Sequence, residues 1–91
     1  EPHLQKLWKQ AVGDAEKTNR IPLLVFRRNN RKAVVVMRKE TYGKFSGYYG
    51  SVLPSISLVL DKEKLVLIPC MNFISWIEGI DSALLKRIFN S

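Results

Sequence analysis

The stretch from Ile21 to Met37 most constrains the fold of this chain, because it holds two short apolar runs separated by a basic segment. The runs, Leu23–Phe26 and Ala33–Met37, are apolar at consecutive positions, which is typical of strands buried on both faces. Asn29 and Asn30 tolerate left-handed backbone conformations and therefore favour a turn between the runs. The stretch predicts a hairpin with a cationic tip.

Four cations fall at this tip: Arg27, Arg28, Arg31 and Lys32. Holding them close together costs electrostatic free energy unless an anion binds there. The net charge of +7 is also uneven, since residues 1–44 hold 11 Lys or Arg against 4 acidic residues. Both observations favour a nucleic-acid partner over a membrane, and DNA is the partner that we predict. The alternative is a basic surface that only maintains solubility.

An amphipathic helix is predicted from Pro2 to about Thr18–Arg20. Its apolar face consists of Leu4, Leu7, Trp8, Ala11, Val12 and Ala15. The opposite side carries a stripe of Lys6, Gln10, Gly13 and Lys17. This stripe could follow a phosphate backbone, with Gly13 allowing close approach, or it could simply be a solvated helix face.

Three segments carry a resemblance to a known family: Trp8-Lys9-Gln10-Ala11, the run from Ile21 to Asn29, and Ala33–Met37. Over residues 4–38 the chain resembles the later half of Holliday junction resolvase-type nucleases of the PD-(D/E)xK superfamily, which act in recombination. The resemblance implies an α/β core, Mg²⁺ in a complete relative, and branched DNA as a substrate. It also implies that Gln10 lies beside the active centre, and that Arg27 and Arg28 lie near the nucleic acid.

The catalytic signature of that superfamily is absent from these 91 residues, because no acidic residue is followed two positions later by Lys. We therefore assign no catalytic and no metal-binding residue, and no cofactor to this chain. The only histidine, His3, stands near a terminus and the chain has a single cysteine, so we expect neither a His/Cys metal site nor a Ser-His-Asp triad within the sequence. We interpret the chain as a fragment of a larger nuclease-like protein that is inactive alone, which leaves enzymatic activity uncertain.

The second half of the chain is predicted to alternate between a loop, a hairpin and a helix. Glycines and aromatic residues from Thr41 to Gly50 favour a loop, in which Lys44 could contact nucleic acid and the aromatics could stack on bases or pack on the sheet. Ile56–Leu60 and Lys64–Ile68 flank Asp61-Lys62-Glu63 and predict a second hairpin. Asn72 is a plausible cap for an apolar helix that continues to about Phe89.

Taken together, residues 1–91 predict a single α/β (α+β) domain, a small mixed sheet of about four strands flanked by an N-terminal and a C-terminal helix. No run approaches the ~20 apolar residues of a membrane span, and we expect a cytoplasmic protein. Unpaired strand edges and the apolar last helix predict a homodimer. Alternatively, the second hairpin completes the sheet of a monomer. A protein-interaction or oligomerisation module with a basic surface is the alternative function.

Overall fold

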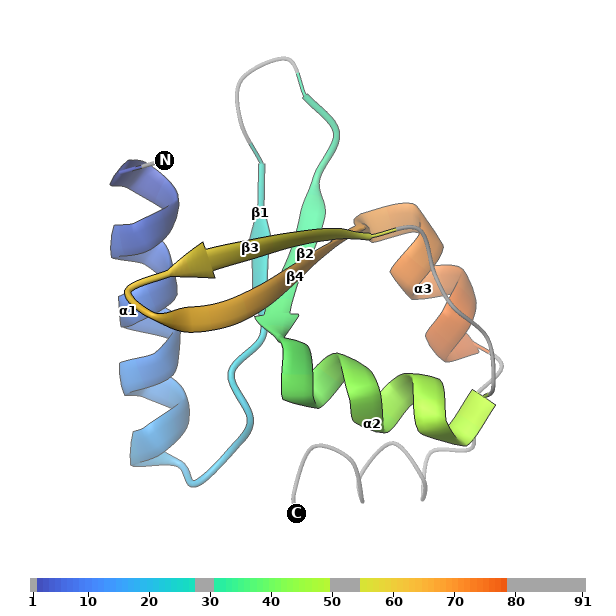
Figure 1. Ribbon diagram of the computed structural model, residues 1–91, viewed down its shortest axis with the longest axis horizontal. Helices are drawn as coiled ribbons and strands as arrows, with labels where there is room; N and C mark the ends of the chain where they lie inside the picture. The colour runs from blue at the N-terminus through green and yellow to red at the C-terminus, as the bar shows by residue number, and fades with distance from the viewer. Residues whose placement is uncertain (1, 28–30, 50–54, 79–91) are drawn as a thin grey trace.

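The computed structural model describes residues 2–27, 31–49 and 55–78, which form three helices and four strands (Figure 1). In chain order these are α1 (Pro2–Lys17), β1 (Leu24–Phe26), β2 (Val34–Arg38), α2 (Lys39–Tyr49), β3 (Ile56–Leu60), β4 (Glu63–Pro69) and α3 (Cys70–Glu78). The predicted α+β class with four strands and flanking helices is therefore confirmed.

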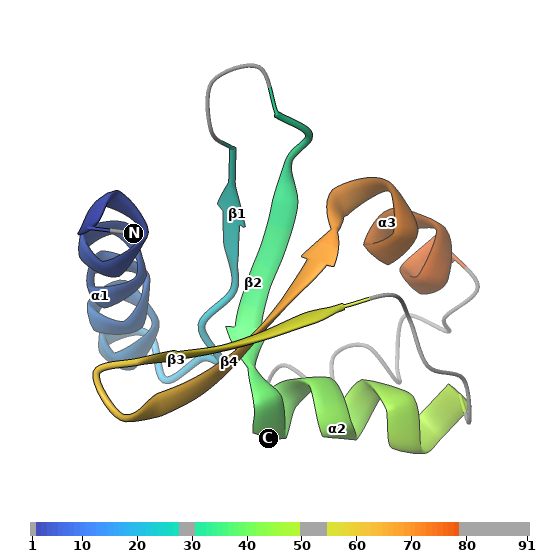
Figure 2. The same ribbon diagram turned by 45° about the horizontal axis from the view of Figure 1, so that its top comes forward.

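The four strands form one sheet in the order β1-β2-β4-β3. Both predicted hairpins are present, and the second joins the first because β4 pairs with β2, from Val34 opposite Pro69 to Arg38 opposite Leu65. All three pairings are antiparallel, so the sheet is antiparallel rather than mixed. Figures 1 and 2 show the β3–β4 hairpin crossing the β1–β2 hairpin at a large angle, as expected for a strongly twisted sheet.

Helices cover both faces of the sheet. Successive side chains of a strand point to opposite faces, so strands that are apolar at consecutive positions present apolar side chains on both. On one face α1 packs Leu4 and Trp8 against a cluster that includes Phe26, Val36 and Leu65. The other face carries α2 and α3, and its buried cluster consists of Val35, Met37, Phe45, Val66, Ile68 and Phe73. The adjacent residues Val35 and Val36 of β2 thus belong to two different cores, and this explains why β2 is apolar at consecutive positions from Val34 to Met37.

The C-terminus of α1 is closed by a residue in the left-handed conformation, Asn19, with a φ of 55°. The amide of Arg20 donates to the carbonyl of Ala15 at 2.8 Å, and the amide of Asn19 donates to Glu16 at 3.2 Å. These two bonds form a Schellman motif, which satisfies carbonyl groups that the helix end would leave free. The predicted end of this helix near Thr18–Arg20 is confirmed.

The loop predicted from Thr41 to Gly50 is wrong, because Lys39–Tyr49 form helix α2. Thr41 and Phe45 are four residues apart and both are buried, so one side of the helix faces the core. Phe45 contacts Phe73 edge to face, with ring centroids 5.6 Å apart. Packing against the sheet and α3 stabilises a helix whose glycine content disfavours it locally.

Two finer predictions also need correction. The strand β1 is not buried on both faces, since Val25 is 62% exposed at the edge of the sheet. Helix α3 begins at Cys70 rather than after Asn72, because the amide of Cys70 donates to the carbonyl of Ala33 and places the first turn directly after β4. The turn at Asn29 and Asn30, and the predicted helix beyond Glu78, lie outside the described residues.

Within the described residues, no helix is long and apolar enough to cross a bilayer.

Candidate nucleic-acid interface

Three of the four cations predicted at the hairpin tip line the same pocket. Arg27 follows β1, and Arg31 and Lys32 precede β2; all three side chains are exposed. The Nε of Arg27 donates to the carbonyl oxygen of Arg31 at 3.1 Å, so the two ends of the tip are joined across the hairpin. Arg28, the fourth cation, lies outside the described residues.

The pocket at the tip, hereafter the tip pocket, combines the β1–β2 hairpin with the start of α3. Its volume is about 830 Å³, and its lining consists of Arg27, Arg31, Lys32, Ala33, Pro69, Cys70, Met71 and Asn72. None of these lining residues is acidic, so no described residue of the lining neutralises the three cations. Three cations and the N-terminal end of a helix create a positive potential there.

Sequence reasoning did not associate α3 with the tip, because the link depends on strand register. Val34 pairs with Pro69, and one residue further the amide of Cys70 donates to the carbonyl of Ala33 at 2.9 Å. These contacts place Cys70, Met71 and Asn72 beside cations that precede them by about forty residues. No local pattern in the sequence indicates this pairing.

The predicted stripe on α1 is exposed, but it lies on the other side of the sheet from α3. Lys6, Gln10 and Lys17 are all exposed, while Leu4, Trp8 and Ala15 face the sheet. A Cβ atom added to Gly13 would meet nothing within 4 Å, so packing within the described chain does not require glycine there. The stripe is therefore an open helix surface that an external ligand could approach closely.

Lys44 does not join either of these groups. It is half-buried on α2, which packs on the sheet face opposite α1. The structure thus brings Arg27, Arg31 and Lys32 together, lines up Lys6, Gln10 and Lys17 on a separate surface, and leaves Lys44 on a third element.

Glu63 is a structural residue that sequence reasoning missed. Its carboxylate forms an ion pair with the Nε of Arg38 and accepts a hydrogen bond from the Nε1 of Trp8 at 3.1 Å. Burial raises the pKa of Glu63, but the hydrogen bonds from Arg38 and Trp8 and the charge of Arg38 together outweigh it, so the pKa is lowered. These contacts connect α1, β2 and β4 through one carboxylate.

Asp61 makes a second connection between α1 and the β3–β4 turn. Gln5 Nε2 donates to its carboxylate at 2.7 Å, and Lys9 Nζ lies 3.3 Å from the other oxygen. The hydrogen bond from Gln5, followed by that from Lys9, lowers the pKa of Asp61. Lys9 therefore has an intramolecular partner at the surface, whereas Lys6 and Lys17 have no ion-pair partner in the part of the chain that the structure describes.

Among the described residues, no three His, Cys, Asp or Glu side chains lie together in a way that could hold a metal ion. Asp61 and Glu63, two carboxylates that lie two positions apart, already have partners: Asp61 contacts Gln5 and Lys9, and Glu63 contacts Trp8 and Arg38. The described donor set does not fit a divalent metal ion, for which several oxygen ligands must converge.

Comparison with protein families gave a match over residues 1–83 of the chain. The matching family is described as "Phage putative PDDEXK endonuclease". No curated protein and no solved structure matched the chain.

Proposed function

Because the chain belongs to the family described as "Phage putative PDDEXK endonuclease", we propose that these residues form a DNA-binding part of such a nuclease and that the tip pocket contacts the DNA backbone. The observation that carries this proposal is the tip pocket itself, where Arg27, Arg31 and Lys32 converge without an acidic neighbour in the described lining.

The chemistry of the tip pocket suits phosphate groups. Arginine offers a planar fork of N–H donors that matches phosphate oxygens, and lysine adds a mobile point charge. Asn72, exposed in the first turn of α3, adds a neutral hydrogen-bonding group beside them. Contacts of this kind position a nucleic acid without selecting its sequence, so weak sequence preference is expected.

The proposed role is binding rather than hydrolysis. The described carboxylates do not converge on a metal site, and the 91 residues contain no acidic residue followed two positions later by Lys. In PD-(D/E)xK nucleases Mg²⁺ would supply the activated water, and nothing in the described donor set fits that ion. We expect no cleavage of DNA by these residues alone.

Narrower features of the proposal come from the resemblance to resolvase-type nucleases. These are a preference for branched DNA, action as a homodimer, and a position for Gln10 beside a catalytic centre. A second candidate DNA contact is the α1 stripe of Lys6, Gln10 and Lys17, which is exposed and without an ion pair among the described residues.

Fluorescence anisotropy with a labelled 30-base-pair duplex tests the proposal over a range of salt concentrations. If about three to five phosphates are contacted, the slope of log affinity against log salt should lie near −0.9 for each of them. The double variant Arg31→Gln/Lys32→Gln should reduce the steepness by about 2 and weaken binding at low salt. Neither side chain donates a hydrogen bond within the described structure, so the fold should survive.

Arg20→Gln is the control for the loss of a single positive charge, since it removes one exposed cation that belongs to neither the tip pocket nor the α1 stripe, and it should change the slope and the affinity far less than the double variant. A titration that stays flat from low to moderate salt would contradict the proposal.

A four-way junction of equal total length measures the preference for branched DNA, and incubation with Mg²⁺ or Mn²⁺ measures cleavage. Cleavage that is lost on mutating one of the chain's own carboxylates would show that it is an active nuclease.

A further inference from the structure

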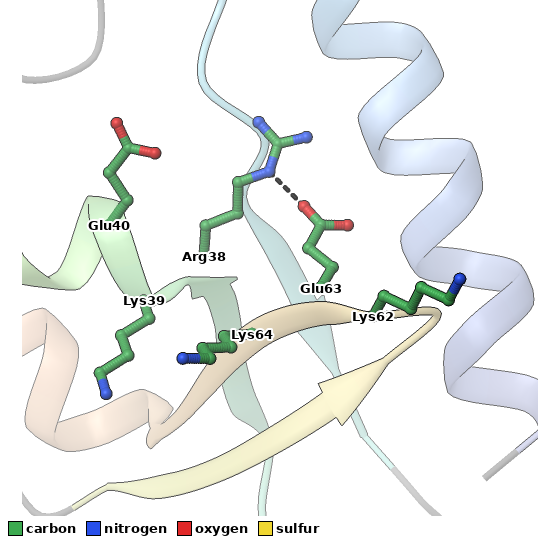
Figure 3. A pocket seen from close by; sticks show the side chains of 6 residues that line it. All are labelled: Arg38, Lys39, Glu40, Lys62, Glu63 and Lys64. Carbon is green, nitrogen blue, oxygen red and sulfur yellow. Dashed lines mark hydrogen bonds and ion pairs between the residues drawn. The ribbon is translucent and has the colours of Figure 1, made fainter.

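A second group of cations lies at the opposite end of β2 from the tip pocket. Arg38 ends β2, Lys39 and Glu40 begin α2, and Lys62, Glu63 and Lys64 come from the β3–β4 turn and the start of β4. These six residues line an open pocket of about 730 Å³, hereafter the α2 pocket (Figure 3). The register of β2 against β4 brings them together, since Arg38 pairs with Leu65.

The positive charge of the α2 pocket is only partly neutralised. Glu63 forms an ion pair with Arg38 and accepts a hydrogen bond from the indole of Trp8, so its carboxylate does not neutralise the lysines. In Figure 3 the side chains of Lys39 and Lys64 extend to the same side, whereas the carboxylate of Glu40 lies on the other side. Within residues 2–27, 31–49 and 55–78, none of Lys39, Lys62 and Lys64 has an ion-pair partner.

We propose that the α2 pocket binds a phosphate group of the same DNA, as a second anchor separate from the tip pocket. The inference rests on the proposed function, because it takes DNA as the ligand. Lysine ammonium groups and the N-terminal end of α2 both favour an anion in this position. The pocket is open to solvent rather than enclosed, which suits a polymer that passes over the surface.

The spacing and the side of the sheet support one ligand for both pockets. Lys32 and Arg38 are six positions apart, and an extended segment of that length spans up to roughly 20 Å. Six nucleotides along one strand of a duplex cover about the same distance. Lys64 pairs with Val59 and lies on the same sheet face as Val66, which is the face that carries α2 and α3. The start of α3 also lines the tip pocket, so both pockets can be reached from this face. A duplex of about six base pairs or more could reach both pockets, whereas a shorter one could not.

Two single variants, Lys39→Gln and Lys64→Gln, test this anchor, with Arg20→Gln as the control of equal charge change. We expect each lysine variant to weaken binding of a 12-base-pair duplex about twofold to fivefold and to reduce the steepness of the salt dependence by about 0.9. Arg20→Gln should retain nearly the affinity of the unmodified chain. For a four-base-pair duplex held in a hairpin, the effect of either lysine variant should be smaller, because one ligand no longer spans both pockets.

Inorganic phosphate provides a probe that does not depend on DNA. In the unmodified chain, phosphate should shift the NMR amide signals of residues 38–40 and 62–64, and Lys64→Gln should reduce these shifts. Unchanged duplex affinity in both lysine variants overturns the second anchor and leaves the proposed function intact. If the chain binds no duplex, the proposed function fails; phosphate shifts at these amides then still support an anion pocket, and their absence rejects it.

Discussion

Among single residues, Glu63 couples the stability of the fold to pH. The pKa of Glu63 is lowered in the folded state, so the folded protein binds this proton less readily than the unfolded chain. The stabilising contribution is therefore complete above the ordinary glutamate pKa of about 4.3, and it is lost as the pH falls through the lower, folded-state pKa. Sequence reasoning gave Glu63 no such role, because one acidic residue in a charged turn usually faces solvent.

Glu63→Gln should lower the free energy of unfolding at pH 7 by about 1 kcal/mol, because the ion pair is lost while Arg38 stays half-buried. The difference from the unmodified chain should shrink as the pH falls below the ordinary glutamate pKa of about 4.3, because the contribution of Glu63 to the unmodified chain is lost there. Urea unfolding at several pH values measures both effects. Glu40→Gln, at an exposed position of α2, is the control and should change stability by less than about 0.5 kcal/mol. A difference that stays constant down to pH 3 would contradict this assignment.

At the scale of elements, a helix or strand could be predicted from the sequence only where the local spacing of apolar residues reflects which side chains are buried. The apolar spacing of α1 and the runs of β1 to β4 gave the helix and both hairpins, because amphipathic periods reflect burial directly. Helix α2 was missed because Gly43 and Gly47 obscure a short apolar face centred on Phe45. The tip pocket was only half predicted, since its α3 side depends on the pairing of β2 with β4.

Two helices carry an interior glycine that the described packing does not require, at Gly13 in α1 and Gly43 in α2. Replacing either glycine with alanine should stabilise the fold by about 0.5–1 kcal/mol, because alanine loses less backbone entropy in a helix. If the α1 stripe follows a DNA backbone, Gly13→Ala should also weaken duplex binding, whereas Gly43→Ala should not. Thermal unfolding and anisotropy measure the two effects. Equal affinity of both variants would exclude close approach of DNA at Gly13.

For the molecule as a whole, the edge strand β3 is the surface most suited to self-association. The sheet order leaves β3 at one side of the sheet, and Ile56–Leu60 contains no charged residue. Ile56 and Val59 are 69% and 64% exposed. Strand edges without charges or proline readily pair with another chain, so the homodimer predicted from the sequence is expected to use this edge.

Sedimentation equilibrium at micromolar and higher concentrations should show a dimer that Val59→Lys converts to a folded monomer, because a charged side chain on an edge opposes strand pairing. Val25→Lys is the matched control, since Val25 is similarly exposed at the other edge of the sheet and should leave the dimer intact. A monomer mass at every concentration of the unmodified chain would reject the dimer and favour the monomer completed by its own second hairpin.

The contacts between α1 and the β3–β4 turn also bear on how the chain reaches its fold. Gln5 and Asp61 are 56 positions apart, and Trp8 and Glu63 are 55 apart. At a synthesis rate of about 5–20 residues per second, the first helix would wait roughly 3 to 11 seconds for the strand against which it docks. Hairpins form within microseconds, so the order of assembly follows the ribosome rather than the intrinsic speed of each element. During that interval Leu4 and Trp8 on the apolar side of α1 lack Leu65 of β4 and have only earlier residues such as Phe26 and Val36 as native partners, so a nascent chain of this kind is a natural client for a chaperone.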